Sequence, residues 1–413
     1  MHTRLDRTKA RRTGGQSATY ERFEEKEDGT LAAYRAVAER VFSQMRPVAG
    51  EGDWSATARV ALEPLLSALQ SDPDAGRLLF VEGLAGGKGI RKERKRVVGE
   101  FERLVGEFLD SAPKDGSTLD IPATAVMGAL RSIVSRHLRT HAEDRLPFAA
   151  EDGLAWVESY AIRTGAERFS TGPRALLKVT PARKPGARGQ RPPRGRQRLP
   201  SGVVAPSQRE RIINGTAEVM MAKGYAKATV ADIVAQARVA REVFYEHFTD
   251  KQHAFMEAQQ HPTQYILDAC AAAYFSADEW PERVWRGLRV LIALIAKNPA
   301  ISHLRLVDCY DAGPAAIERA EEITRSFTFF LEEGYSYREK ARGLPRLSSE
   351  AIAGAIFEVI QRHVALGESA ELPRYLPQLT YIAITPFMGA EEAIGVVEKL
   401  SVGEPLRHPP ESS

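Results

Sequence analysis

Hydrogen-bonding side chains recur between residues 229 and 251 at a spacing that suits binding rather than catalysis. Four of them carry donors, namely Thr229, Tyr245, His247 and Lys251. A hydroxyl, a phenol, an imidazole and an ammonium group all donate readily to phosphate oxygens. The segment therefore offers several donors to a ligand that accepts hydrogen bonds.

Three further residues stand between these donors, directly after a short turn. They are Ala240, Arg241 and Glu242. An arginine makes a bidentate contact with guanine, and a glutamate accepts a hydrogen bond from cytosine N4. If this triplet opens a helix, it can face the edges of bases while the donors hold the phosphate backbone.

The remaining candidates for chemistry are weaker. Gly83–Gly89 contains a Gly-Gly-Lys-Gly run, but no Ser or Thr follows Lys88, so we interpret it as a plain loop rather than a phosphate-binding loop. His137 and His141 are four residues apart, a spacing that places two possible metal ligands on one face of a helix. We interpret them instead as packed or solvated side chains. The two cysteines form no pair at ligand spacing. We expect neither an enzyme nor a bound cofactor.

The bulk composition fits a protein of two or three globular domains. The chain has 413 residues, 43% hydrophobic and 27% charged. The longest apolar stretch, around Leu288–Ala296, is interrupted by Arg289 and is too short to span a bilayer. No secretory signal pattern opens the sequence. We expect a cytoplasmic protein without a membrane partner.

Positive charge is concentrated in one segment. Nine Lys or Arg residues and no acid lie between Arg174 and Pro200, whereas the rest of the chain has 48 basic against 54 acidic residues. The Pro- and Gly-rich stretch Arg183–Pro206 lacks the apolar residues needed to fold alone and is typical of a linker. Two interpretations stay open: a solvated spacer, or an arm that lies along phosphates.

The sequence on either side of this linker repeats at an offset of 225–226 residues, which indicates a tandem duplication. The matches fall in three blocks: Tyr20, Glu21, Phe23 and Lys26 with Tyr245, Glu246, Phe248 and Lys251; Trp54, Leu62, Leu65, Pro73, Leu78 and Val81 with Trp280, Leu288, Leu291, Pro299, Leu304 and Val307; and Gly128, Arg136, His137 and Leu146 with Gly354, Arg362, His363 and Leu372.

Both copies are predicted to be all-α. In the second copy, apolar residues recur at helical spacing from Trp280 until Asn298-Pro299 ends the helix. Further helices are expected over 315–332, 350–366 and 376–399, the last broken or kinked at Pro386.

Three short helices are predicted in the segment that carries the candidate contacts. Ser207-x-x-Glu210 is a capping box that opens a helix whose apolar face runs from Ile212 to Met221, and Gly224 ends it. Thr229-x-x-Asp232 opens a second helix, and Ala237–Val239 turns into a third over 240–248. This order is a helix-turn-helix, whose last helix enters the major groove of DNA.

The stretch from Gly224 to Lys251 resembles the DNA-binding domain of the TetR (tetracycline-repressor) family along its whole length. The resemblance rests on Thr229, Asp232-Ile233, the Ala-x-Val turn, Phe244-Tyr245 and the final Phe-x-x-Lys. Arg238 stands where the family usually has Gly, so the turn must take a positive φ with a bulky residue or shift.

The resemblance implies a sequence-specific transcriptional regulator of double-stranded DNA, with Thr229, Tyr245, His247 and Lys251 on phosphates and Ala240, Arg241 and Glu242 on bases. Phe244 and Phe248 are assigned to packing. It further implies helical regulatory domains that enclose an unknown small-molecule effector and pair through their last two helices, and a repressor released by that ligand. Residues such as Trp285, Tyr310 and Phe357 are equally good core residues, so no effector contact is assigned. The alternative is a small-molecule carrier or enzyme that keeps a relic head.

The expected domains are 1–175, a truncated copy; 176–206, the linker; 207–255, the DNA-binding head; and 256–401, the regulatory domain. The first copy matches the second only from Tyr20 onward and lacks an apolar stripe like Ile212–Met221, so we expect that it reads no DNA. It would then pair with the second copy as a pseudo-dimer within the chain, or the chains would pair as a homodimer; the tether favours the former.

Overall fold

The computed structural model describes residues 29–41, 43, 54–81, 88–110, 118–162 and 207–403. The predicted linker lies outside these ranges, and so does the first matching block of the repeat, from Tyr20 to Lys26. We call residues 29–162 the first half and residues 207–403 the second half.

Helices dominate both halves, as the sequence predicts. The first half contains a helical segment over 29–41, followed by α2 (Trp54–Ser71), α3 (Pro73–Phe80), α4 (Lys88–Asp110), α5 (Ala123–Arg139) and α6 (Leu146–Glu158). The second half contains α7 (Gln208–Lys223), α8 (Val230–Ala237), α9 (Arg241–His247), α10 (Lys251–Gln260), α11 (Thr263–Tyr274), α12 (Trp280–Lys297), α13 (Pro299–Leu306), α14 (Pro314–Ser326), α15 (Gly334–Tyr337), α16 (Leu347–Ala365), α17 (Leu376–Met388) and α18 (Ala390–Gly403).

The extended structure in the described ranges is one short antiparallel pair, β1 (Thr118–Leu119) and β2 (Ala161–Ile162), with Thr118 opposite Ile162. The sequence did not predict this pair, because two residues are too short to produce an alternating pattern. It does not change the fold class, which is all-α.

Corresponding helices begin and end at corresponding places in the two halves. Helix α2 runs from Trp54 to Ser71 and α12 from Trp280 to Lys297, so both ends differ by 226 positions. Helices α3 and α13, which both begin with proline, are related by the same offset at both ends. Proline suits the first turn of a helix because the N–H that it lacks has no partner there.

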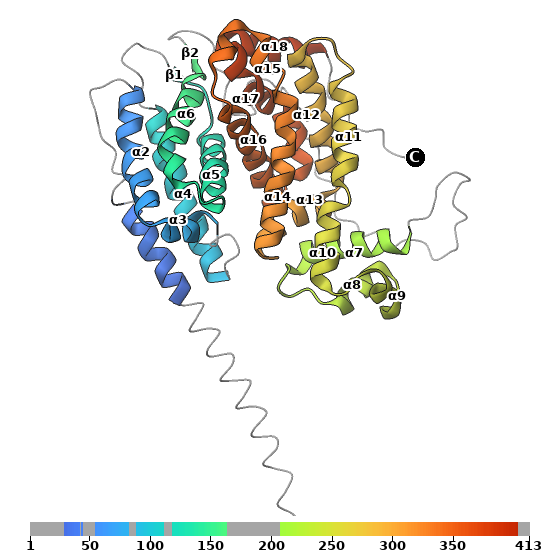
Figure 1. Ribbon diagram of the computed structural model, residues 1–413. Coiled ribbons are helices and arrows are strands. Elements are labelled where there is room, and N and C mark those ends of the chain that lie inside the picture. The colour runs from blue at the N-terminus through green and yellow to red at the C-terminus, as the bar shows by residue number, and fades with distance from the viewer. Residues whose placement is uncertain are drawn as a thin grey trace, which may run out of the picture.

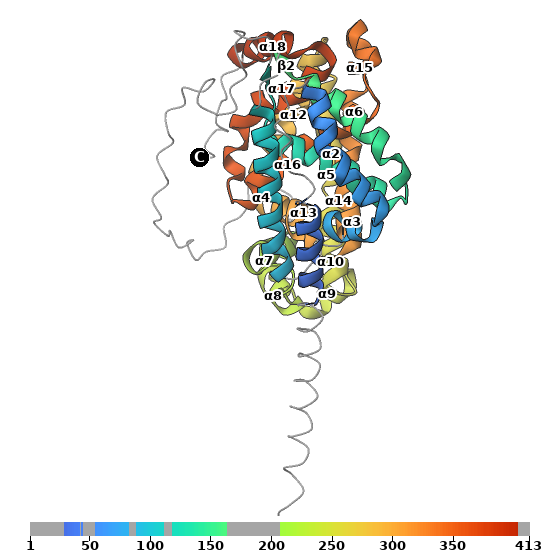
Figure 2. The same ribbon diagram turned by 90° about the vertical axis from the view of Figure 1, so that its left-hand side faces the viewer.

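The two halves lie side by side, and the head formed by α7, α8 and α9 lies at one end of the second half (Figure 1). The view turned by 90° keeps the head at that same end (Figure 2). The halves share one hydrophobic core, in which Trp156 and Tyr160 are buried together with Tyr381 and Phe387. The expected boundary between residues 255 and 256 falls within α10.

The contact between the halves is centred on α5 and α16, which approach closely at two glycines. A β-carbon on Gly128 would lie 2.6 Å from the carbonyl oxygen of Gly354, and one on Gly354 would lie 2.8 Å from that of Gly128. Both distances are shorter than real Cβ contacts, so the two helices can cross at this distance only because both residues lack a side chain.

Polar contacts across this crossing are reciprocal. The Arg136 guanidinium lies 3.1 Å from the Glu350 carboxylate, and its counterpart Arg362 donates to Thr124, 2.8 Å away, at the position that corresponds to Glu350. Positions that are 226 residues apart in the sequence therefore make matching contacts in both directions across the crossing.

The range 376–399 is divided as expected, but the break lies at Gly389 rather than at Pro386: α17 runs through Pro386, and the chain turns at Gly389, whose φ is +90°, before α18 begins. A proline inside a helix leaves the carbonyl four residues earlier without its N–H donor, here that of Ile382. The Tyr160 hydroxyl of the first half donates to this oxygen at 2.7 Å. The orphaned acceptor is thereby satisfied.

No single helix of the described ranges is long and apolar enough to cross a membrane. Helix α12 and the segment Pro299–Tyr310 reach that length and hydropathy only when taken together, and the chain bends by 104° between them.

Candidate DNA-binding surface

The three helices of the head pack around their own apolar cluster. Ile212, Ile213 and Met220 of α7 are buried with Phe244 and Phe248, which confirms the packing role assigned to the two aromatic residues. The cluster continues into α10, α13 and α14 through Phe255, Leu304 and Ala316. The head therefore packs directly against the other helices of the second half through a shared apolar cluster.

One residue of the predicted apolar face is misplaced. Met221 is 45% exposed, whereas its neighbour Met220 is fully buried. Successive helical residues are about 100° apart, so the buried face that includes Met220 turns Met221 toward solvent.

Both predicted capping boxes are present and fix where α7 and α8 begin. The Ser207 hydroxyl accepts from the backbone N–H of Glu210 at 3.2 Å, and the Glu210 carboxylate accepts from the Ser207 N–H at 2.7 Å. The Thr229 hydroxyl accepts from the N–H of Asp232 at 3.2 Å and donates to its carboxylate at 2.8 Å. Each box satisfies N–H groups that would otherwise lack partners.

Thr229 lies exposed at the start of α8, as a phosphate contact requires. The nearby carboxylate of Asp232 also pairs with Lys223 at 2.6 Å, and the hydrogen bonds from Lys223 and Thr229 lower the pKa of Asp232. The Lys223 ammonium offsets the negative charge that this carboxylate would present to a phosphate.

The turn between α8 and α9 is made by a left-handed residue. Arg238 has φ 54° and ψ 48°, and its carbonyl accepts from the Arg211 guanidinium at 3.2 Å. Of the two outcomes that the sequence left open for this position, the chain takes the positive φ with a bulky side chain.

Replacing Arg238 by glycine is expected to raise the free energy of unfolding by about 1 kcal/mol, because glycine adopts this conformation without steric penalty. Arg238→Ala is the matched control, since it removes the same side chain but keeps the Cβ that causes the penalty. Chemical denaturation of both variants checks this. Equal stabilities would show that the turn carries no such strain.

The third helix, α9, extends over Arg241–His247, with Ala240 and Phe248 as its caps, in agreement with the predicted range 240–248. Arg241, Glu242 and Tyr245 are exposed, the last to 47%, and Ala240 is exposed at the start. The Arg241 guanidinium lies 3.4 Å from the Tyr245 hydroxyl. The structure thus brings all three candidate base-contacting residues to the amino-terminal end of α9, facing away from the head.

Lys251 makes contacts within the protein that the sequence did not predict. Its Nζ donates to the carbonyl oxygen of Tyr225 at 2.7 Å and lies 4.3 Å from the centre of the Tyr225 ring. The half-buried position lowers the pKa of Lys251 through desolvation. Lys251 therefore ties the start of α10 to the loop between α7 and α8. His247 is half-buried nearby on α9.

The candidates that the sequence analysis set aside have simple environments. His137 is buried with its Nδ1 2.8 Å from the Ile133 carbonyl oxygen, whereas His141 is exposed. Lys88 and Gly89 begin α4, and residues 83–87 lie outside the described ranges. Within the described part of the chain, no group of three or more His, Cys, Asp or Glu side chains is placed to hold a metal ion.

A set of cavities lies next to the head, where the resemblance implies a small-molecule pocket whose lining residues the sequence left unassigned. The one nearest the head has a volume of about 230 Å³ and is lined by Ile213 and Asn214 of α7 and by residues of α11 to α14. Arg305 lines this cavity and also a second one between the halves. The signal available in the sequence was Arg305, a basic residue between Leu304 and Leu306 of α13.

These observations define a helix-turn-helix protein with an exposed reading helix. Residues 212–258 match the family model of the bacterial regulatory proteins of the tetR family. The chain carries the DNA-binding domain of the TetR family and is a DNA-binding transcriptional regulator. No curated protein matches the chain.

Among solved structures, the chain is similar to three regulators named FadR. The fatty acid degradation regulator of Bacillus halodurans is 17% identical, over 44% of this chain and 97% of its own, with a TM-score of 0.40. The Bacillus subtilis regulator, in complex with stearoyl-CoA, is 15% identical over 42% and 96%, with a TM-score of 0.38. The Thermus thermophilus repressor, in complex with lauroyl-CoA, is 16% identical over 50% and 99%, with a TM-score of 0.29.

Proposed function

We propose that the protein is a cytoplasmic repressor that reads DNA with a single head and leaves it when a small molecule binds the second half. The observation that carries this proposal is the exposed amino-terminal end of α9, where Arg241 and Glu242 stand free of the apolar core. We assign Arg241, Glu242 and Ala240 to base edges. Thr229, Tyr245, His247 and Lys251 are assigned to phosphates.

Release by a ligand is supported by the position of the 230 Å³ cavity. Ile213 and Asn214 of α7 form part of its wall, so a molecule inside it would touch the first helix of the head. Helix α10, whose Phe255 packs in the apolar cluster of the head, is in turn linked to α14 by the Gln259 side chain, which donates to the Ala316 carbonyl at 2.7 Å. Occupancy of the cavity would shift α7 relative to α14 and thereby reorient α9.

We further propose that the first half descends from a duplicated copy and acts as an internal partner, so that the chain is a pseudo-dimer. The 226-residue offset between α2 and α12 and the reciprocal contacts across α5 and α16 support this. The surface through which a second chain would pair is then already covered. In this scheme the domains are 1–175, 176–206, 207–255 and 256–401, and the basic linker adds phosphate attraction without sequence preference.

Arg241→Ala is expected to weaken binding to the preferred sequence by about 1–3 kcal/mol while leaving binding to unrelated DNA nearly unchanged, because the lost contact is to a base. Arg346→Ala is the matched control, since this arginine is 75% exposed on the second half, outside the head. Shift assays at one fixed salt concentration, with specific and competitor DNA, check the prediction. An equal loss on both DNAs would assign Arg241 to phosphates instead.

The one-headed arrangement predicts that the free protein has the mass of one chain, 45.6 kDa, and that one chain binds each DNA site. Footprinting should then protect one half-site without a two-fold related copy, whereas paired heads protect two half-sites about one helical turn apart. Light scattering and footprinting measure both. A stable dimer that protects two half-sites would contradict the internal pairing.

The alternative, a small-molecule carrier or enzyme with a relic head, is favoured only by the cavities. It predicts no preference for any genomic fragment over competitor DNA, so selection of fragments by the purified chain separates the two proposals. Retention of fragments next to particular genes would also indicate the class of effector.

A further inference from the structure

Arg305 is a buried cation without a counter-ion. It lies in the last turn of α13 and is only 8% exposed. The terminal nitrogen Nη2 donates to the Thr263 hydroxyl at 3.1 Å, whereas the second terminal nitrogen, Nη1, is buried without a hydrogen-bond partner. No carboxylate of the described ranges lies within ion-pairing distance of it. Burial lowers the pKa of Arg305 to about 10.

An unpaired cation in this position is unfavourable for stability alone. Removing a charge from water is costly unless an opposite charge and hydrogen bonds compensate. An arginine also keeps its charge under all physiological conditions, so it cannot escape the penalty by losing a proton. An anion that binds beside the guanidinium would offset this cost.

The surroundings of Arg305 differ on its two sides. Toward the first half lies a polar cavity of about 150 Å³ lined by three acids. Two of them pair with arginines of the first half, Glu321 with Arg139 and Glu350 with Arg136, and the third, Glu318, is exposed. Toward the head and α12 lies the 230 Å³ cavity, whose wall is mainly apolar, with Leu291, Ile295 and Phe327 among its residues.

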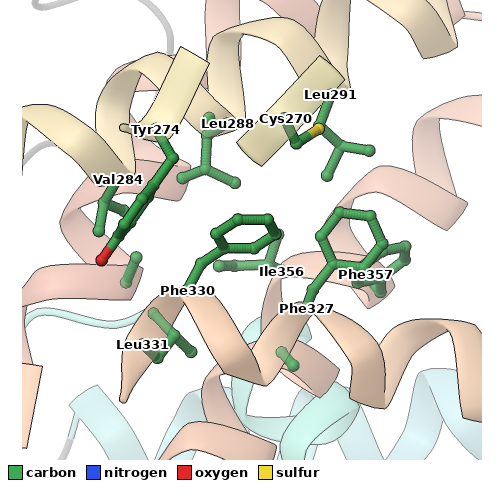
Figure 3. Close-up of a pocket in the computed structure, with 13 residues that line it drawn as sticks. Cys270, Tyr274, Val284, Leu288, Leu291, Phe327, Phe330, Leu331, Ile356 and Phe357 are labelled. Carbon is green, nitrogen blue, oxygen red and sulfur yellow. The ribbon is translucent and has the colours of Figure 1, made fainter. Parts of the chain in front are cut away.

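The apolar lining continues away from Arg305. A smaller cavity of about 40 Å³ shares Leu291, Phe327 and Phe357 with the larger one. In Figure 3, the rings of Phe330 and Phe357 face Leu288, Cys270 and Leu291 across this smaller cavity. The two cavities are therefore neighbours that share an apolar wall, and of the two only the larger is lined by Arg305.

We propose that the effector is an elongated amphipathic anion, with its anionic head on Nη1 of Arg305 and an unbranched apolar chain along Leu291, Phe327 and Phe357. This inference rests on the proposed function, because it names the ligand class of the same regulatory site. A carboxylate and a phosphate both match the guanidinium, and a matched neutral head group does not.

The test measures binding to the full chain without DNA, by calorimetry, with three ligands of equal chain length: dodecanoate, dodecyl phosphate and dodecanol. Both anions are expected to bind at least about tenfold more tightly than the alcohol, and the tighter of the two identifies the head group. In Arg305→Met this preference should disappear, while Arg346→Met retains it. Removal of an uncompensated buried charge should leave the melting temperature equal or higher, which shows that the variant is folded.

A second variant tests the apolar end. A β-carbon on Gly287 meets nothing closer than 3.7 Å, and Gly287 lines the smaller cavity, so Gly287→Leu should fill that cavity without a backbone clash. It should shift the preference from dodecanoate toward octanoate. Equal binding of dodecanol and dodecanoate by the unaltered chain, or an unchanged preference in Arg305→Met, overturns the proposal. Because no DNA is present, failure of the DNA-binding function would not produce either result.

Discussion

Replacing Gly128 by alanine is expected to lower the free energy of unfolding by about 2–3 kcal/mol, although alanine is the better helix former. The new methyl group would lie 2.6 Å from the Gly354 carbonyl oxygen and against the β-carbon of Glu358, neither of which is the free end of a flexible side chain. Helices α5 and α16 would have to separate, and the core shared by the halves would loosen. Chemical denaturation measures the loss.

The control is Gly99→Ala in α4 of the same half. A β-carbon there meets nothing within 4 Å, so only the helix propensity changes and the variant should gain about 0.5–1 kcal/mol. Opposite signs for the two substitutions would confirm that the crossing, rather than helix propensity, governs Gly128. A stabilised Gly128→Ala would mean that the halves do not meet at this point.

The sequence predicts the head well because its signals are local. The two capping boxes, at Ser207-x-x-Glu210 and Thr229-x-x-Asp232, each place both partners within one helical turn, so no distant residue can alter them. Asn298-Pro299 ends α12 for the same kind of reason. The long gapped pattern that resembles the family then fixes how these helices are joined.

Where the prediction fails, the deciding contact comes from far away in the chain. Pro386 should interrupt a helix, and the local argument is sound. The Tyr160 hydroxyl, which satisfies the carbonyl that proline leaves free, lies 222 positions earlier. No periodicity within α17 reveals it.

The same limit applies to the candidate site. The sequence places Arg241, Glu242 and Tyr245 on a single short helix, and all three are exposed there. The role of Lys251 as a tie to Tyr225, and the isolation of Arg305, both depend on elements that meet only after folding. Helical periodicity identifies buried residues, but it cannot tell a residue of a cavity wall from one of a filled core.

The largest electrostatic effect is expected at Glu358, whose carboxylate accepts two hydrogen bonds from Arg131 of the first half. The donors are the Nε at 3.0 Å and one terminal nitrogen at 2.7 Å. The two side chains are only 17% and 19% exposed, so water screens the pair weakly. Without the carboxylate, Arg131 keeps, among the described residues, one hydrogen bond, to the Tyr310 hydroxyl at 3.4 Å, and the more distant attraction of the Glu321 carboxylate.

Glu358→Leu is therefore expected to lower the free energy of unfolding by about 3 kcal/mol, because it leaves a poorly solvated cation between the halves. The double variant Arg131→Met, Glu358→Leu should recover most of that loss, since two apolar side chains can fill the same space. Glu371→Leu is the control: its partner Arg374 is on the surface, and the expected change is at most about 1 kcal/mol. Denaturation of Glu358→Leu, of Arg131→Met and of the double variant completes a double-mutant cycle that isolates the interaction energy of the pair. A double variant no more stable than Glu358→Leu would show that Arg131 is well solvated, and that the halves are not held together at this pair.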